Sequence, residues 1–438
     1  MTELAQERLA PQDALKYAAN LLVLCVIAVA ALTGGMAALV AALAIGLSVH
    51  VYQHPEDAIA AGPMFLLACN VFFPSSARFD WQLDAREMVW WAAGLLCITL
   101  AAILRIGIRN AFRMPKSLLT FLGVAVLASL YGFVHGNQPS YVLRQLFGIL
   151  VFVAYFVFGQ QFGDERGFLE RCRPYAVICA AAFFVYYIAI FGEYGVHKEI
   201  TTLPTQAAIL AILFASFNGW RWKAAAALMA AVPILLVMRH DIVVLLLAGT
   251  IGAAIKIKFK SLRWAAWALA AVVTVVSLAP PLVGIVLEAA MGSSTVDKLI
   301  PEGARDSSSV ADRGIQLLSA IEVVRRAPIL GGGMGSEIAW EGVVRGEVSQ
   351  AYVDNGWAYL LVKMGIAGSL AFAWFIVELV RRMRHGSVRL TTLLLSMLLL
   401  VMFTEPVFFQ FTYSPFLGAA AGLLFQDTTD RTTLIVQS

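Results

Sequence analysis

Three arginines occupy positions at which a cation could bind an anionic group at a membrane surface. Arg239 stands in a turn so tight that its guanidinium must lie at the membrane interface, and Arg313 begins a predicted helix. Arg144 lies at the end of another apolar run. Guanidinium groups with few carboxylates beside them suit a phosphate or diphosphate head group. An interfacial arginine can also simply extend its charge to lipid phosphates. Both interpretations stay open for Arg144, whereas the neighbouring His240 and Asp241 favour binding by Arg239.

Asp354 is the candidate general base. It stands at the start of the helix that follows a long polar loop, with Asn355 beside it. A carboxylate at this position commonly caps the helix, but in an outer cavity it could take a proton from a reacting hydroxyl group. Lys363 lies further into the apolar run, where a charge is a functional candidate, although its long side chain could also extend outward. Further polar side chains predicted on the same side of the membrane are His240, Glu405 and Tyr413.

A glycine-rich turn lies in the polar loop. A helix is predicted before it, from about Ser309 to Arg326, because serines precede it and apolar residues recur on one face. Pro328 ends this helix. The glycines that follow, including Gly333 and Gly335, would let the backbone approach a bound ligand closely, although an ordinary glycine turn explains them equally well. The turn lacks the Lys-Ser/Thr pair of a P-loop, so nucleotide binding is not supported.

The elements that must position these residues are membrane-spanning helices. The chain has 438 residues, of which 60% are hydrophobic and 14% charged, and its mean hydropathy is +0.79. A water-soluble protein of this size could not bury that much apolar surface. Since a span needs roughly 20 apolar residues, the fold class is an all-α polytopic membrane protein with about 12–14 transmembrane helices. The predicted spans are 15–33, 36–53, 58–74, 87–106, 117–135, 141–162, 174–192, 203–219, 222–238, 241–257, 264–287, 355–380, 390–408 and 411–426.

One large loop divides the chain. Residues 1–287 form N-terminal transmembrane helices, residues 288–352 form the loop with its surface helix, and residues 353–438 form C-terminal transmembrane helices and a short tail. Basic residues gather in alternate short turns, and such turns remain in the cytoplasm. Both termini are therefore predicted in the cytoplasm and the loop outside it, where there is no ATP or nucleotide-sugar pool. A catalyst there needs a donor that is already activated and delivered through the membrane.

The chemistry that fits these residues is the displacement of a diphosphate. The negative charge of this leaving group needs stabilisation by a metal or by arginines. No cluster of carboxylates or histidines on the outer face has the spacing of a metal site, and none of the five cysteines lies in the loop. We therefore expect no metal and assign the role to the arginines. A base near Asp354 would take the proton of a sugar hydroxyl that attacks the anomeric carbon, and this single displacement inverts that carbon.

The order of these features resembles the O-antigen ligase and O-antigen polymerase superfamily of bacterial envelope glycosyltransferases. The turn at residues 328–333 has the pattern Pro-x-Leu-Gly-x-Gly, and residues 354–368 have the pattern (His/Asp)-Asn…Leu-Leu…Gly-Ile-x-Gly. The detailed likeness covers roughly residues 310–370. The resemblance implies a GT-C-like helical fold, an undecaprenyl-diphosphate-linked glycan as donor, and no metal or cofactor. It also implies that residues matching Arg239 and Arg313 hold the diphosphate.

Polymerisation of lipid-linked repeat units is the predicted reaction. In the ligase branch, the position matching Asp354 is usually a histidine that activates the acceptor, so the aspartate here favours a polymerase. A ligase that transfers the glycan to lipid A-core is the alternative. The expected partners are the lipid-linked donor and acceptor, membrane lipids and a chain-length regulator, with no nucleic acid. The expected location is the bacterial inner membrane, with the active site on the periplasmic side.

Two other classes of function remain open. A transporter or flippase of a lipid-linked sugar would place charges along a path through both halves of the bilayer, whereas the candidate residues here gather on one side. A non-catalytic scaffold would not need exposed arginines beside a glycine-rich turn. An enzyme is therefore the favoured class.

Overall fold

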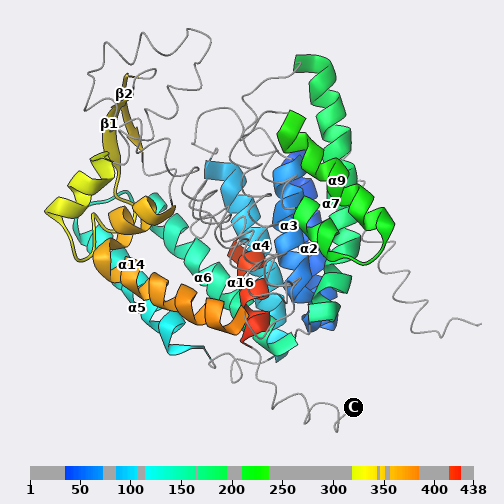
Figure 1. The fold of residues 1–438 in the computed structure, drawn as a ribbon, viewed down its shortest axis with the longest axis horizontal. Coiled ribbons are helices and arrows are strands. Elements are labelled where there is room, and N and C mark those ends of the chain that lie inside the picture. The colour runs from blue at the N-terminus through cyan, green and yellow to red at the C-terminus, as the bar shows by residue number, and fades with distance from the viewer. Residues whose placement is uncertain are drawn as a thin grey trace, which may run out of the picture.

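The computed structural model describes residues 35–72, 85–106, 114–162, 165–194, 210–235, 318–342, 346–350, 356–383 and 414–425. Within these ranges most of the chain is helical, and short helical stretches also occur at residues 210–216 and 318–326 (Figure 1). The named elements in chain order are α2 (Gly35–Gln53), the 3-10 turn η1 (Pro55–Asp57), α3 (Ala58–Phe72), α4 (Ala85–Ile106), α5 (Lys116–Val134), α6 (Pro139–Phe162), α7 (Glu165–Tyr194), α9 (Trp220–Leu235), β1 (Ile338–Gly342), β2 (Gly346–Gln350), α14 (Gly356–Met383) and α16 (Ser414–Leu424).

Three described helices are long and apolar enough to cross a membrane. They are Lys116–Val134 in α5, Pro139–Gln161 in α6 and Ala358–Met383 in α14. These helices confirm the all-α polytopic membrane class. The predicted spans 15–33, 241–257, 264–287 and 390–408 lie outside the described residues. The total of 12–14 spans and the division into three parts therefore stay predictions.

Helix α6 lies between the helices α5 and α14 on one side and the helices α2, α3 and α4 on the other (Figure 1). It packs against α16, α5 and α3, while α14 lies along α5, and α2 packs against α4 (Figure 1). Glycines allow α6 and α16 to touch closely. A methyl group on Gly418 would lie 2.3 Å from the carbonyl oxygen of Phe152, and one on Gly422 would lie 2.0 Å from that of Phe156. Small residues four positions apart are typical of close helix packing in membranes.

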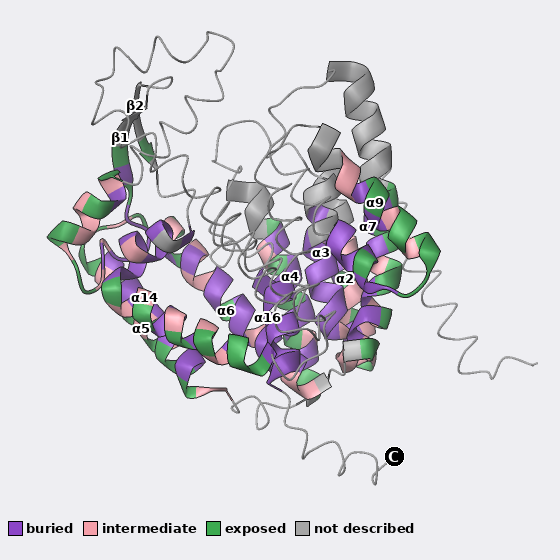
Figure 2. Ribbon diagram, in the orientation of Figure 1, coloured by how far each residue is buried: buried purple, intermediate pink, exposed green. Residues whose placement is uncertain are grey.

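An aromatic core joins α6, α14 and the end of α16. The ring of Phe375 lies 5.8 Å from that of Phe152 and 6.1 Å from that of Phe156, between centroids. Phe425 lies 6.2 Å from Phe375 and 5.2 Å from Phe156. Buried residues face this interior, whereas exposed residues follow the outer side of α5 (Figure 2). The exposed residues of α5 include large apolar ones, as a lipid-facing helix requires.

A β-hairpin follows the glycine-rich turn, and the sequence-based prediction did not include it. Strands β1 and β2 pair antiparallel, with Ile338 opposite Gln350 and Gly342 opposite Gly346. Ile338 is buried at the base of the hairpin. The two glycines stand where the strands end, which is a common position for residues at a chain reversal. The hairpin is an addition to an otherwise helical fold.

The described bundle has two polar ends. Helix α6 begins beside the turn at residues 135–138, and its C-terminal half lies against α3 and η1. With 24 residues, it is roughly 36 Å long at about 1.5 Å per residue. We call the first end the glycine-turn end and the second, with residues 54–57 and the start of α7, the charged end. Which end faces the cytoplasm stays a prediction.

Candidate functional site

Three of the predicted site residues lie in the described part of the chain, and all three lie at the glycine-turn end. Gly333 and Gly335 belong to the segment 328–336, here called the glycine turn, and Arg144 lies near the start of α6. The N–H of Gly335 donates to the side chain of Gln145, the neighbour of Arg144, so the structure brings these residues together. The predicted residues outside the described ranges are Arg239, His240, Arg313, Asp354, Asn355, Glu405 and Tyr413, whose roles stay predictions.

The glycine turn is inserted into a break in α14. The break is at Gly365, whose backbone has φ 62° and ψ −159°. In an unbroken helix the N–H of Ile366 would donate to the carbonyl of Val362, four residues earlier. Here Ile366 donates instead to the carbonyl of Pro328 at 2.9 Å, and Val362 accepts from the N–H of Gly332 at 2.7 Å. The turn thus supplies a new partner for the N–H of Ile366 and for the carbonyl of Val362.

Two glycines are required for this insertion. A methyl group on Gly365 would lie 2.3 Å from the carbonyl oxygen of Ile329, and one on Gly331 would lie 2.3 Å from that of Val362. Both glycines also have a positive φ, which side chains with a Cβ atom rarely adopt. Ala367, just after the break, donates to the carbonyl of Ile329 at 3.1 Å. The backbone of the glycine turn touches the backbone of α14 here, and a larger residue at either glycine would push the two apart.

Asn137 ties the same turn to the end of α5. Its side-chain amide donates to the carbonyls of Gly332 at 2.9 Å and Met334 at 2.8 Å. The N–H of Met334 in turn donates to the carbonyl of Ala128 at 3.0 Å. The approach is close, since a methyl group on Gly132 would lie 2.2 Å from the carbonyl oxygen of Met334. One amide side chain therefore holds two points of the turn.

Gly333 and Gly335 face the helices of the bundle. A methyl group on Gly333 would lie 2.8 Å from the Cα of Gly132, and one on Gly335 would lie 2.6 Å from Cγ2 of Val142. The N–H of Gly335 donates to Oε1 of Gln145 at 2.7 Å. In the described part of the chain, the glycines at 333 and 335 let the turn approach α5 and α6 closely. Their predicted role in binding substrate stays a prediction.

Four buried polar side chains connect the turn to α6 and α14. We call Gln145, Ser336, Tyr359 and Lys363 the polar ring. Gln145 accepts from Gly335 and hydrogen-bonds with the side chain of Tyr359. The amine of Lys363 lies 5.4 Å from the centroid of the Tyr359 ring and donates to the carbonyl oxygen of Ser336. Buried polar groups are generally hydrogen-bonded, and here hydrogen bonds and one cation–π contact connect the glycine turn, α6 and α14.

Lys363 does not extend outward to the membrane surface. It is completely buried, and its amine also lies 3.5 Å from Oγ of Ser336. Arg144 is half-buried on α6 and lies close enough to Tyr359 to act electrostatically on its hydroxyl group. Arg144 therefore lies beside the polar ring. Its predicted role in binding a phosphate group stays a prediction.

The loop helix is present over its described part, residues 318–326, and ends before the proline as predicted. Glu322 forms an ion pair with Arg326, with 3.0 Å between Oε1 and Nε. Both side chains are exposed, so the pair contributes little to stability. Leu318 and Ile321, which were predicted on the apolar face, are exposed too. An exposed apolar face fits a helix that lies on a membrane surface.

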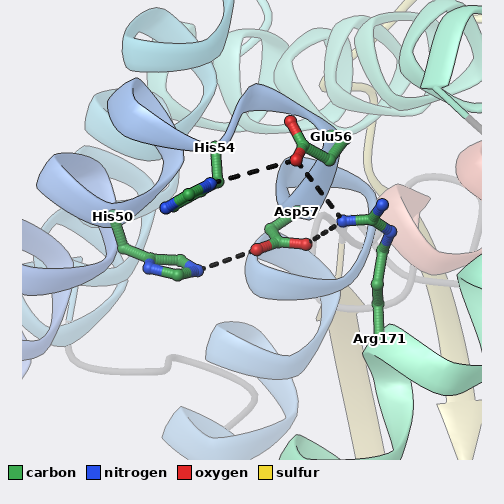
Figure 3. A network of polar contacts seen from close by, with 5 residues as sticks. All are labelled: His50, His54, Glu56, Asp57 and Arg171. Carbon is green, nitrogen blue, oxygen red and sulfur yellow. Dashed lines mark hydrogen bonds and ion pairs between the residues drawn. The ribbon is translucent and has the colours of Figure 1, made fainter. Parts of the chain in front are cut away.

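A second polar cluster occupies the charged end (Figure 3). Nε2 of His50 lies 2.9 Å from Oδ2 of Asp57, and the guanidinium of Arg171 donates to Oδ1 of Asp57. Glu56 lies 3.9 Å from both Arg171 and His54. Burial alone would raise the pKa of Asp57, but the bonds from His50 and Arg171 outweigh it, and the pKa lies below its ordinary value. This cluster clamps the start of α7 to the turn between α2 and α3.

Sequence reasoning missed several of these residues. Asn137 and Gln145 make contacts across about 190 positions of the chain, and no local pattern predicts such contacts. The charged cluster had a visible signal, because His50, His54 and two acidic residues surround a turn after an apolar run. Arg171 is one of the basic residues in the short turns that were predicted in the cytoplasm.

The described ranges contain no group of three or more His, Cys, Asp or Glu residues that could hold a metal ion. The cysteines described are Cys69, Cys97, Cys172 and Cys179, and none of these four is in a disulfide. The expected independence from metal and cofactor stays a prediction.

Comparison with known families matches residues 224–373 to the family model described as O-antigen ligase. The match covers about a third of the chain, and it includes the glycine turn, both strands and the break in α14. It confirms the resemblance to the O-antigen ligase and polymerase superfamily that the patterns at residues 328–333 and 354–368 indicate. No curated protein matches the chain.

Proposed function

From the likeness to O-antigen ligases, we propose that this chain is a multi-pass membrane glycosyltransferase that polymerises glycan repeat units carried on undecaprenyl diphosphate. The family match supports an enzyme of the O-antigen ligase or polymerase type. The choice of polymerase is our inference from Asp354, which stands where ligases usually have histidine.

The observation that carries the proposal is the insertion of the glycine turn into the break of α14. Helix α14 begins at Gly356, two residues after Asp354. Its first segment is held by the backbone bond between Gly332 and Val362, and its second segment by the bond between Ile366 and Pro328. A helix end fixed in this way supports a base in the residues just before it, because catalysis depends on accurate placement of reacting groups. Arg144 lies at the same end of the bundle.

The proposed reaction is a single displacement. A hydroxyl group of the acceptor sugar attacks the anomeric carbon of the donor sugar and gives its proton to the carboxylate of Asp354. The bond between that carbon and the diphosphate oxygen breaks, and the lipid diphosphate leaves with the electron pair. Arg239, Arg313 and Arg144 stabilise its negative charge. The attack comes from the side opposite the leaving group, so the configuration of the anomeric carbon is inverted.

The deciding experiment uses purified protein and lipid-linked repeat units, with products separated by length. A ladder of products from this donor alone supports a polymerase. Transfer only after lipid A-core is added identifies the ligase alternative, which the description of the matched family favours. Absence of transfer in both mixtures, from protein that is folded, contradicts the enzymatic proposal.

We also propose that the glycine-turn end faces the periplasm. Exposed positions at the two ends offer a matched pair for labelling, His135 at the glycine-turn end and Arg166 at the charged end. In a cysteine-free background, a membrane-impermeant maleimide should label His135→Cys in intact cells, and Arg166→Cys only after the membrane is opened. The reverse pattern would move the site to the cytoplasm.

A further inference from the structure

Lys363 is a charged residue type inside an apolar helix, and its surroundings are unusual for a lysine. The side chain is completely buried, and its amine donates to the carbonyl oxygen of Ser336. A polar group in this position is costly unless it is hydrogen-bonded. Methionine would fill a similar volume without that cost, but it has no hydrogen to donate. What lysine adds at this position is the bond to Ser336.

Ser336 is the point at which the glycine turn leaves the bundle. It follows Gly335, whose N–H is held by Gln145, and precedes the buried Ile338 at the base of β1. The turn is fastened to the first segment of α14 at a second point, where Gly332 donates to Val362. Helix α14 also holds the start of the turn, because Ile366 donates to Pro328 and Ala367 donates to Ile329. Among these contacts between the turn and α14, the bond from Lys363 is the one that holds the end of the turn, at residue 336.

We propose that Lys363 is a positioning residue, which holds the glycine turn and the base of the hairpin in a fixed register with the first segment of α14. Its amine is engaged by Ser336, so the residue acts through the backbone of the turn. Tyr359, one turn earlier in α14, lies under the amine and hydrogen-bonds with Gln145, which extends the same restraint to α6.

This inference rests on the proposed function for its consequence in catalysis. The predicted base Asp354 precedes the first segment of α14, and the predicted diphosphate ligand Arg144 is beside Gln145. A change in the register between turn and helix would therefore separate the base from the donor. A misplacement of about 1 Å costs on the order of a hundredfold in rate. Binding of the donor diphosphate would suffer less, because the arginines themselves are unchanged.

The test compares three variants with the wild-type protein. Lys363→Met removes the bond to Ser336, and Lys363→Arg keeps a donor at the same place. Thr120→Ala is the control, because it removes a hydroxyl that donates to the carbonyl of Lys116, 2.9 Å away, near the start of α5 and away from the glycine turn. Two quantities are measured, the hydrogen exchange of backbone amides at residues 332–336 and the separate values of kcat and of KM for the donor.

In Lys363→Met, the backbone amides of residues 332–336 should exchange at least about tenfold faster than in the wild type. The value of kcat should fall on the order of a hundredfold, while KM for the donor stays within about threefold. Lys363→Arg should recover part of both losses, and Thr120→Ala should resemble the wild type. Unchanged exchange and unchanged kcat in Lys363→Met would overturn the proposal. So would a rise in KM with kcat preserved, since this would mean that Lys363 serves donor binding.

Two further outcomes are distinguishable. If the wild type transfers no glycan, the proposed function fails, while the exchange data still decide whether Lys363 holds the turn. If Lys363→Met does not yield folded protein, Lys363→Gln takes its place, since its shorter side chain cannot reach the same oxygen. Faster exchange at residues 332–336 is again expected, and unchanged exchange again overturns the proposal.

Discussion

The two polar ends of the described bundle are built in different ways. At the charged end, histidine, carboxylate and guanidinium groups from α2, η1 and α7 neutralise one another. At the glycine-turn end, backbone groups and neutral amides join α5, α6 and α14 to a loop that is distant in sequence. By residue type alone, the charged end looks more like a catalytic site. Yet its contacts are those of a clamp, and the family match falls on the other end.

This contrast shows that the type of a residue is a weaker guide to function than the partners that its atoms have. Half-exposed ion pairs contribute about 0–1 kcal/mol each, so the charged end can be altered at small cost. Breaking a buried hydrogen bond and leaving one partner unsatisfied costs about 1–3 kcal/mol. Changes at the glycine-turn end should therefore affect both stability and turnover, and changes at the charged end should affect stability alone.

The largest effect is expected for Asp354→Asn. The amide retains the ability to cap the helix but cannot accept a proton, so kcat should fall by about 10² to 10⁴ if Asp354 is the base. Glu378→Gln provides the control, since this carboxylate lies at the other end of α14 and accepts from Ser117. Transfer rates of the purified proteins are compared at saturating donor. An unchanged rate for Asp354→Asn returns this residue to a capping role.

Gly365→Ala should cause the next largest loss. The substitution forces alanine into a positive φ and places a methyl group 2.3 Å from the carbonyl oxygen of Ile329. Strain of this kind costs about 1–3 kcal/mol, and the glycine turn should leave the break. The thermal unfolding midpoint and kcat should both decrease.

The control for this change is Gly123→Ala in α5. No atom lies within 4 Å of the new methyl group there, and the residue is exposed in the interior of a helix. Alanine should stabilise such a helix by about 0.5–1 kcal/mol. If both substitutions had the same effect, the close contact between the turn and α14 would not matter for stability.

Asn137→Ala should have a smaller effect, mainly on stability. It removes two hydrogen bonds and leaves the carbonyls of Gly332 and Met334 without this donor, at a cost of about 2 kcal/mol. Thr120→Ala in α5 is the matched control, because its hydroxyl donates only to Lys116 on an exposed side of the helix. Thermal unfolding measures the difference. Equal midpoints for the two variants would show that Asn137 does not hold the turn.

Much of the fold could be predicted from the sequence, because the bilayer sets the length of an apolar run. The predicted spans 117–135, 141–162 and 355–380 agree closely with Lys116–Val134 in α5, Pro139–Phe162 in α6 and Gly356–Met383 in α14. The break at Gly365 was not predicted, although the glycine was noticed. An apolar run gives no sign that its backbone partners come from another segment.

The candidate site was predictable only in part. The glycine pattern located the turn, and the resemblance pointed to the superfamily that the family match also indicates. What the glycines touch depends on α5, α6 and α14, which meet the turn only in three dimensions. Lys363 was recognised as a candidate by its residue type, but its partner, Ser336, is 27 positions away and acts through its backbone. A backbone carbonyl has no signature in a sequence.

The smallest effect is expected at the charged end, for Asp57→Asn. Because the pKa of Asp57 in the folded protein lies below its ordinary value, the folded state binds this proton less tightly than the unfolded chain does. The stabilisation by His50 and Arg171 is therefore fully present above pH about 4 and is lost as pH falls through the lowered pKa. At pH 7 the wild type should unfold at a slightly higher temperature than Asp57→Asn, and the two midpoints should converge as the pH is lowered below the ordinary pKa of aspartate, about 4. The rate of glycan transfer at pH 7 should be the same in both proteins. If the difference between the two unfolding midpoints grew as the pH fell, the direction assigned to the pKa shift of Asp57 would be wrong. A large loss of glycan transfer in Asp57→Asn would mean that the two ends of the bundle are not separate in function.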